Sequence, residues 1–271
     1  MVDSSTNGTP GLGDRAIGLR DVTKRYEVRR GESVTALEGF DLGVGDGEFV
    51  ALIGPSGCVK STALRLAAGL ETAESGSVAV FGAPPGRTVR EGGIGMAFQD
   101  HALMPWLSVE SNIGLPFRIR GEPRDQAKVA ELIALVGLTG FERARPKHLS
   151  GGMRQRVSIA RSLVLGPRVL LLDEPFGALD AVTRRALNLE LQHLWSRQQI
   201  TTVLVTHSVE EALLLGDRVA VMSRRPGRVI LEVAAPFERP RHKAVSHTDE
   251  FKRLHDQLVA ALDEPTAPAE L

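Results

Sequence analysis

The sequence has few cysteines and aromatic residues and no excess of charge of either sign. Cys58 is the single cysteine, so no disulfide can form within the chain, which fits a reducing compartment. Lys and Arg number 33, as do Asp and Glu. The chain therefore has no overall positive field of the kind that attracts nucleic acids, and we expect no nucleic-acid partner.

Long hydrophobic runs are missing as well. No uninterrupted apolar stretch approaches the roughly 20 residues that a helix needs to cross a bilayer. Residues 1–15 are rich in Gly, Ser and Thr and have no basic run followed by an apolar one. They predict a disordered tail and not a secretory signal. Any role at a membrane would then depend on a partner protein.

Short apolar runs alternate with helical patterns along the rest of the chain. Strands are expected near Phe49–Ile53, Val169–Leu172, Thr202–Val205 and Val219–Met222. Helices are expected near Ser61–Leu70, Gly152–Leu165 and Val182–Gln198. This alternation predicts an α/β fold whose mixed sheet has parallel strands at its centre. The strand-rich segments at 17–44 and 77–81 predict an antiparallel β edge subdomain.

The domain prediction follows from where these patterns change. Residues 16–232 form one domain, and the strand signal disappears over about 99–160, which predicts an inserted helical subdomain. Residues 233–271 form an extension that begins proline-rich and ends in a tail expected to be disordered. Between these two parts, apolar residues at helical spacing predict one amphipathic helix: Phe251, Leu254, Leu258 and Leu262.

A glycine-rich turn links the apolar strand at Phe49–Ile53 to a helix start. The backbone N–H groups of such a loop bind phosphate oxygens, Lys60 reaches the β- and γ-phosphates, and the Ser61 hydroxyl reaches Mg²⁺. An ordinary βα turn in a Rossmann-like sheet is the alternative. The predicted phosphate-binding residues are Gly54, Pro55, Ser56, Gly57, Cys58, Val59, Lys60, Ser61 and Thr62.

Two carboxylates follow the apolar strand at Val169–Leu172. Asp173 can hold Mg²⁺ through water, and Glu174 can act as general base on the water that attacks a phosphate. A strand can also end in an acid that only caps the next element. Earlier in the chain lies the segment Leu149–Arg156, where a helix begins. Its Ser150, Gly151 and Gly152 could cap that helix or present a second anion site.

Together these motifs resemble the ABC ATPase family over about residues 17–240. The resemblance implies the ABC type of P-loop NTPase fold, with ATP and Mg²⁺ as cofactors and ATP hydrolysis as the activity. In that family the signature, here Leu149–Met153, binds the γ-phosphate that the opposite subunit's phosphate loop holds. A head-to-tail dimer is therefore implied, with a second ABC ATPase subunit that is expected to be another copy of this chain.

The resemblance also gives roles to single residues. Tyr26 would stack on adenine, Asp180 would organise the dimer seam, and His207 would contact the γ-phosphate. Gln99 would sense Mg²⁺ and the attacking water. Taken singly, Tyr26 could be core, Gln99 a surface amide and His207 a buried hydrogen-bonded histidine, but their order and spacing favour the family roles. The catalytic set is then Lys60, Gln99, Glu174 and His207, and the metal set is Ser61, Gln99 and Asp173.

Within the family, three phrases look like importer subunits for nitrate, aliphatic sulfonates or taurine: residues 100–107, 210–212 and 223–228. This implies a peripheral protein on the cytoplasmic side of the inner membrane. It would bind a transmembrane permease and, indirectly, a substrate-binding protein. The run Leu103-Met104-Pro105-Trp106 is a candidate docking surface for a permease helix, and subdomain core is its alternative.

Family phosphate loops carry glycine where this chain has Val59. If the position requires a positive φ, a β-branched residue there is strained by about 1–3 kcal/mol. Expressed wholly in binding, that weakens ATP roughly 5- to 150-fold. Because the other motif residues are intact, we hypothesise an ATPase of reduced activity. The alternatives are a non-catalytic docking subunit and a soluble ABC ATPase, which usually has a second cassette or a long coiled coil.

Overall fold

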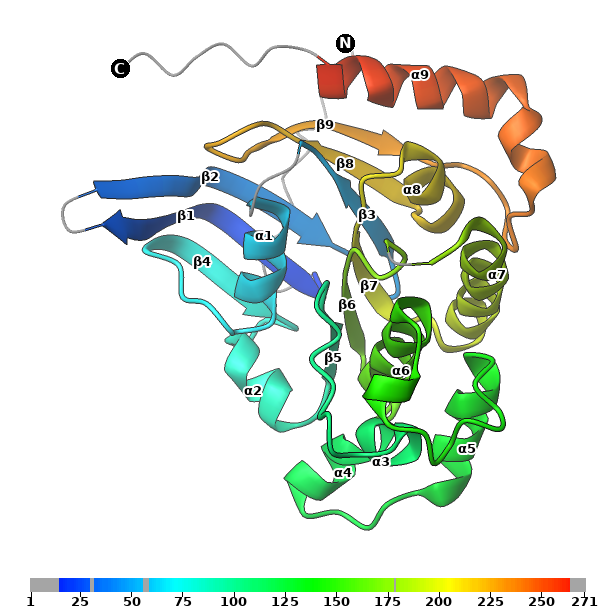
Figure 1. Ribbon diagram of the computed structural model, residues 1–271. Helices are drawn as coiled ribbons and strands as arrows, with labels where there is room; N and C mark the ends of the chain where they lie inside the picture. The colour runs from blue at the N-terminus through cyan, green and yellow to red at the C-terminus, as the bar shows by residue number, and fades with distance from the viewer. Residues whose placement is uncertain (1–14, 30–31, 56–58, 178, 264–271) are drawn as a thin grey trace, which may run out of the picture.

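The computed structural model describes residues 15–29, 32–55, 59–177 and 179–263 (Figure 1). Its strands are β1 Ile17–Arg29, β2 Glu32–Val44, β3 Phe49–Ile53, β4 Ser75–Val80, β5 Ile94–Ala97, β6 Val169–Asp173, β7 Thr201–Val205, β8 Arg218–Met222 and β9 Val229–Ala234. Its α-helices are α1 Val59–Ala67, α2 Pro85–Arg90, α3 Val109–Ile113, α4 Leu115–Arg120, α5 Gln126–Leu135, α6 Gly151–Leu163, α7 Ala181–Gln198, α8 Val209–Leu215 and α9 Asp249–Asp263. Short 3₁₀ helices occupy Pro146–His148 and Lys243–His247.

The larger sheet has six strands in the order β5-β6-β7-β3-β8-β9. All neighbouring strands are parallel except β9, which pairs antiparallel with β8. Every residue of β3, β6 and β7 is buried, as expected of strands covered on both faces. Because these strands run in one direction, the residues that follow Ile53, Asp173 and Val205 emerge at the same edge of the sheet.

The antiparallel subdomain is a separate three-stranded sheet in the order β2-β1-β4. Figure 1 shows it in blue and cyan, with α1 lying between it and the larger sheet. The predicted subdomain is therefore present, but the antiparallel edge of the central sheet is made by β9 instead. Within the described residues, one isolated β-bridge, between Leu37 of β2 and Gly227 before β9, joins the two sheets.

A group of helices covers the other end of the molecule, drawn in green in Figure 1. Three of them begin at a side-chain cap: Ser108 for α3, Asp125 for α5 and Ser150 for α6. Their apolar faces share one cluster with β6 and α7. The stretch 99–160, predicted as an inserted helical subdomain, holds α3, α4, α5 and most of α6.

The C-terminal part of the described chain returns to the central sheet. Helix α9 packs on α8, β8 and β9, and it buries Phe251, Leu254 and Leu258, while Leu262 is half-buried. Apart from Arg15, the tail predicted for residues 1–15 lies outside the described residues, as does the chain after 263. No helix among the described segments is long and apolar enough to cross a membrane.

Candidate functional site

The phosphate-loop segment connects β3 to α1 at the carboxyl edge of the central sheet. Lys60 lies in the first turn of α1 and is buried. Its Nζ donates to the carbonyl oxygens of Gly54 and Pro55, at 2.9 Å each. Burial lowers the pKa of Lys60, while the carboxylates of Glu174 and Asp173 act in the opposite direction. The predicted residues Ser56, Gly57 and Cys58 lie outside the described residues.

Two oxygen donors meet beside this lysine. The Ser61 hydroxyl donates to Asp173 Oδ1 at 2.9 Å, and burial raises the pKa of Asp173. A hydroxyl and a carboxylate this close together suit Mg²⁺, which binds oxygen ligands. Water and phosphate oxygens usually supply several of those ligands. No group of three or more His, Cys, Asp or Glu in the described chain could hold a metal.

Glu174 is held by side chains that follow two other strands. His207, after β7, places Nε2 2.5 Å from Glu174 Oε1, and Gln99, after β5, donates from Nε2 to Oε2 at 3.2 Å. The backbone N–H of Glu174 donates to Val205 O at 3.0 Å. Glu174 also has a left-handed backbone, with φ at 48°, a conformation that non-glycine residues adopt mainly where the surroundings enforce it. Gln99, Glu174 and His207, all predicted to be catalytic, are thus in contact.

Tyr26 lies at the edge of the same region. Its hydroxyl is 3.3 Å from Thr62 Oγ1 in α1, and the Lys24 ammonium is 5.3 Å from its ring centroid. The ring is half-buried and belongs to the antiparallel sheet. Its stacking on adenine stays a prediction.

The signature and Asp180 have local capping roles. Ser150 is exposed and accepts from the N–H of Met153 at 3.2 Å, while Gly151 and Gly152 form the first turn of α6. Asp180 accepts from the N–H groups of Val182 and Thr183 at 3.0 Å each. Hydrogen bonds from Thr183 and Val182 lower the pKa of Asp180. Contacts of either motif with a second subunit stay predictions.

Val59 does not meet the condition on which the strain argument rests. It is the first residue of α1, and it is not among the non-glycine residues with positive φ. Its side chain is 4% exposed and packs in a cluster with Leu37 of β2. A Cβ added at Gly227 would lie only 2.0 Å from Val59 Cγ1. The valine side chain therefore fills a space that the absence of a side chain at Gly227 leaves open.

Sequence reasoning missed a buried pair behind His207. Thr206, which follows β7, and Glu211, in α8, are both buried, and the Thr206 hydroxyl donates to Glu211 Oε2. In the sequence analysis, Glu211 was noted only as part of the segment 210–212, which resembles importer subunits. Its place in the first turn of α8, where acidic residues are common, gave no signal that it is buried.

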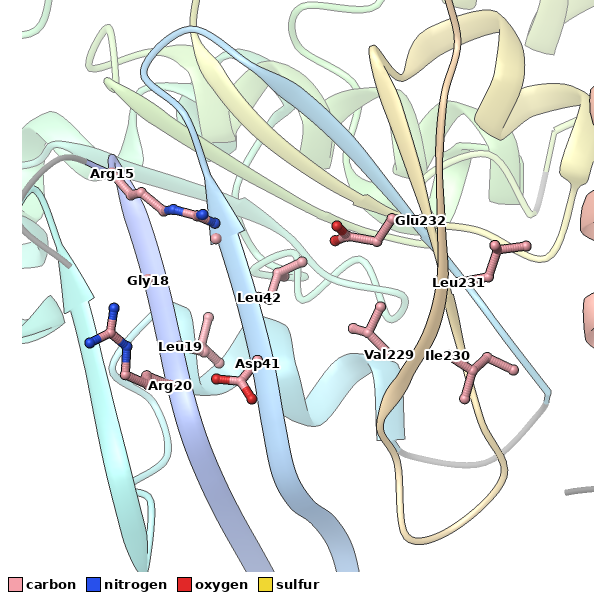
Figure 2. A pocket seen from close by; sticks show the side chains of 11 residues that line it. Arg15, Gly18, Leu19, Arg20, Asp41, Leu42, Val229, Ile230, Leu231 and Glu232 are labelled. Carbon is pink, nitrogen blue, oxygen red and sulfur yellow. The ribbon is translucent and has the colours of Figure 1, made fainter. Parts of the chain in front are cut away.

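A large hollow lies elsewhere in the described part of the molecule. It has a volume of about 530 Å³ and lies between the antiparallel sheet and the β8–β9 hairpin (Figure 2). Leu19, Leu42, Val229 and Leu231 line it together with charged side chains. The lining includes none of the residues that surround Glu174, so size alone does not locate the chemistry. The charged lining residues are Arg15, Arg20, Asp41 and Glu232.

Comparison with known proteins gives a consistent result. The family model described as ABC transporter matches residues 37–177. The chain is 42% identical over 244 residues to the aliphatic sulfonates import ATP-binding protein of Bacillus subtilis, covering 89% of this chain and 92% of that protein. It is 42% identical over 250 residues to the taurine import ATP-binding protein of Burkholderia pseudomallei, covering 90% and 95%.

Solved structures agree in fold. A dimeric structure of MJ0796, a bacterial ABC transporter cassette, superposes with a TM-score of 0.74 at 31% identity, covering 82% of this chain and all of that one. A post-hydrolysis state of the same cassette, bound to ADP and Pi, gives a TM-score of 0.75 at 30% identity with the same coverage.

Proposed function

The chain belongs to the ABC transporter family, and from that premise we propose that it is the ATP-hydrolysing subunit of an importer for small anionic solutes. It is an ATPase whose ATP hydrolysis is coupled to solute import. The sulfonate and taurine import proteins that it resembles support the solute class, with nitrate as a further member. Residues 16–232 are its ATPase domain, and residues 233–271 are an extension.

One observation carries the proposal. Side chains from four separate segments converge at the carboxyl edge of the central sheet, around Glu174. Bound ATP·Mg²⁺ would supply the phosphoanhydride bond and the charge that stabilises its cleavage. Lys60 would bind the phosphates, while Ser61 and Asp173 would hold the ion. Glu174 would accept the proton of the attacking water, oriented by His207 and Gln99.

Calorimetric titration of the full chain with ATP·Mg²⁺ tests this proposal. We expect binding by the wild-type chain and none by Lys60→Ala. We expect Glu174→Gln to bind with wild-type affinity but to hydrolyse ATP at least about 100-fold more slowly, because only proton transfer is lost. Absence of ATP binding by the wild-type chain would instead support a non-catalytic docking subunit.

The loop Leu103–Leu107 is our proposed contact with the permease. Trp106 is 67% exposed, whereas Leu103 packs on the helical cluster, so the docking and core interpretations apply to different residues of one run. The buried amide of Asn112 fixes the loop: it accepts from Met104 N at 2.8 Å and donates to the carbonyls of Met104, Leu107 and Ser108.

An adjacent groove extends this surface. It has a volume of about 310 Å³ and lies between β5, α4 and α6, with the 76% exposed Ile119 at its margin. Exposed apolar side chains beside a groove are typical of a protein interface. Its lining includes Met96, Phe98, Ala102, Leu115, Pro116 and Ile119.

Fractionation of the native cells tests the docking surface and the peripheral location. We expect the wild-type chain in the membrane fraction and Trp106→Asp mainly in the supernatant. ATP affinity is the control, and it should be the same in both proteins. Equal recovery of both proteins in the membrane fraction would contradict this docking site.

A further inference from the structure

The loop that carries His207 is fastened to helix α8 on both sides of the histidine. Before it, the Thr206 hydroxyl donates to Glu211 Oε2. After it, the N–H of Ser208 donates to Thr206 Oγ1 at 3.1 Å, and the N–H of Glu211 donates to Ser208 Oγ at 3.2 Å. Thr206, Ser208 and Glu211 therefore form a closed set of hydrogen bonds. The exposed imidazole of His207 lies between the first two of them in the sequence.

Glu211 is the buried anchor of this set. It is 6% exposed, and the next residues on α8, Ala212 and Leu213, belong to the apolar core. Withdrawing Thr206 would leave its carboxylate without that donor in a buried place, which is costly. The pair is therefore held firmly, and the position of Thr206 restricts where the next side chain can lie.

The opposite side of Glu211 faces helix α7. Arg184 attracts its carboxylate, while Glu210, the neighbour on α8, repels it. Arg184 Nη2 also donates to Leu179 O at 3.0 Å, directly before Asp180. Glu211 thus lies where the His207 loop and the turn after Glu174 both attach to the helices. The hollow beside it, about 180 Å³, is lined by further charged side chains: Arg185, Arg241 and Lys243.

We propose that Glu211 is a positioning residue that acts through Thr206 to hold His207 against Glu174. The contact that it supports is the 2.5 Å approach of His207 Nε2 to Glu174 Oε1. A backbone hydrogen bond from Thr206 N to Leu52 O, at 3.2 Å, fixes the strand end before the histidine. The kinetic consequence of this inference rests on the proposed function.

The main test compares Thr206→Val, which keeps the shape but loses the hydroxyl, with Thr206→Ser, which keeps the hydroxyl. We expect Thr206→Val to lower kcat about 10-fold or more, because a misplaced group near the reacting atoms slows the chemistry. The KM for ATP should stay within about twofold, since the phosphate loop is untouched. Thr206→Ser and the exposed Glu210→Gln should behave like the wild-type chain.

A double substitution separates positioning from general damage. If Glu211 acts through His207, adding Thr206→Val to His207→Ala lowers kcat no further than His207→Ala alone. Independent, multiplicative losses would overturn the inference. If Thr206→Val does not fold, Thr206→Val combined with Glu211→Leu replaces both partners by apolar groups and gives the same measurements.

The second readout needs no nucleotide. The imidazole ¹⁵N signals of His207, identified by their loss in His207→Ala, should shift in Thr206→Val and stay in place in Thr206→Ser. Unchanged signals in Thr206→Val would overturn the inference. If the His207 signals shift in Thr206→Val but the wild-type chain does not hydrolyse ATP, the proposed function is rejected and the positioning role stands.

Discussion

The surroundings of Val59 in the structure change how this residue is interpreted. The sequence has a β-branched residue where glycine is usual. The expected cost was backbone strain, on the assumption that the position requires a positive φ. In the structure Val59 begins a helix and its side chain is buried against Leu37 and Gly227. The hypothesis of reduced activity stays a prediction, because the neighbouring residues 56–58 lie outside the described part of the chain.

The packing of Val59 against Gly227 predicts a coupled pair. Gly227→Ala should destabilise the wild-type chain by about 1–3 kcal/mol, because the new methyl group would overlap Val59. The same substitution in a Val59→Ala background should cost clearly less. Urea unfolding of the four proteins gives the coupling free energy. Additive losses would show that the two side chains do not compete for this space.

Glu211 predicts a pH dependence of stability. Burial raises its pKa above the ordinary value of 4.5. The folded state therefore binds more protons than the unfolded state, so this group contributes stability below pH 4.5 that is lost as the pH rises through its folded-state pKa. The free energy of unfolding of the wild-type chain, relative to Glu211→Gln, should fall over that range.

Urea unfolding at several pH values from 4 to 8 measures this difference. The matched control is Glu210→Gln, which replaces the exposed neighbouring carboxylate. A wild-type chain whose stability relative to Glu211→Gln rises with pH would contradict the role of burial.

At the scale of elements, α9 tests whether the extension is part of the folded core. Leu258 is fully buried against the β8–β9 side of the sheet, while its neighbour Gln257 is exposed. Leu258→Ala should lower the free energy of unfolding by about 2–5 kcal/mol through lost burial and a cavity. Gln257→Ala should change it by less than about 0.5 kcal/mol. Equal small effects would mean that α9 is dispensable.

Element prediction from the sequence worked where the signal is local. The strand predicted at Phe49–Ile53 has those bounds, and the helix predicted at Val182–Gln198 begins one residue earlier. Continuous apolar runs and helical periodicity do not depend on distant partners. Strand β5 gave no such signal, because it is short and contains Gly95. A Cβ there would lie 2.0 Å from Ser162 O in α6, so tertiary approach explains that glycine.

At the scale of the whole molecule, the exposed signature predicts an ATP-dependent dimer. Glu174→Gln should retain bound ATP, because hydrolysis that would reset the dimer is blocked. Light scattering with ATP·Mg²⁺ should then report twice the monomer mass. The solved cassette that this chain resembles is described as dimeric.

The matched control is Ser150→Asp in the Glu174→Gln background. Aspartate remains a good helix cap, so α6 should stay folded. Its negative charge would repel the γ-phosphate of the opposing subunit, and the dimer should disappear. A dimer that persists in this variant would exclude the signature from the interface.

The sequence by itself determined the family, the α/β class and the identity of the residues that gather around Glu174. Motif spacing could do this because each motif is a continuous stretch attached to a strand or helix end. Only the tertiary structure decided that Val59 faces Gly227, that the antiparallel strands form their own sheet, and that Glu211 supports Thr206. Each of these depends on which distant segments become neighbours, and that is set by the packing of the whole core.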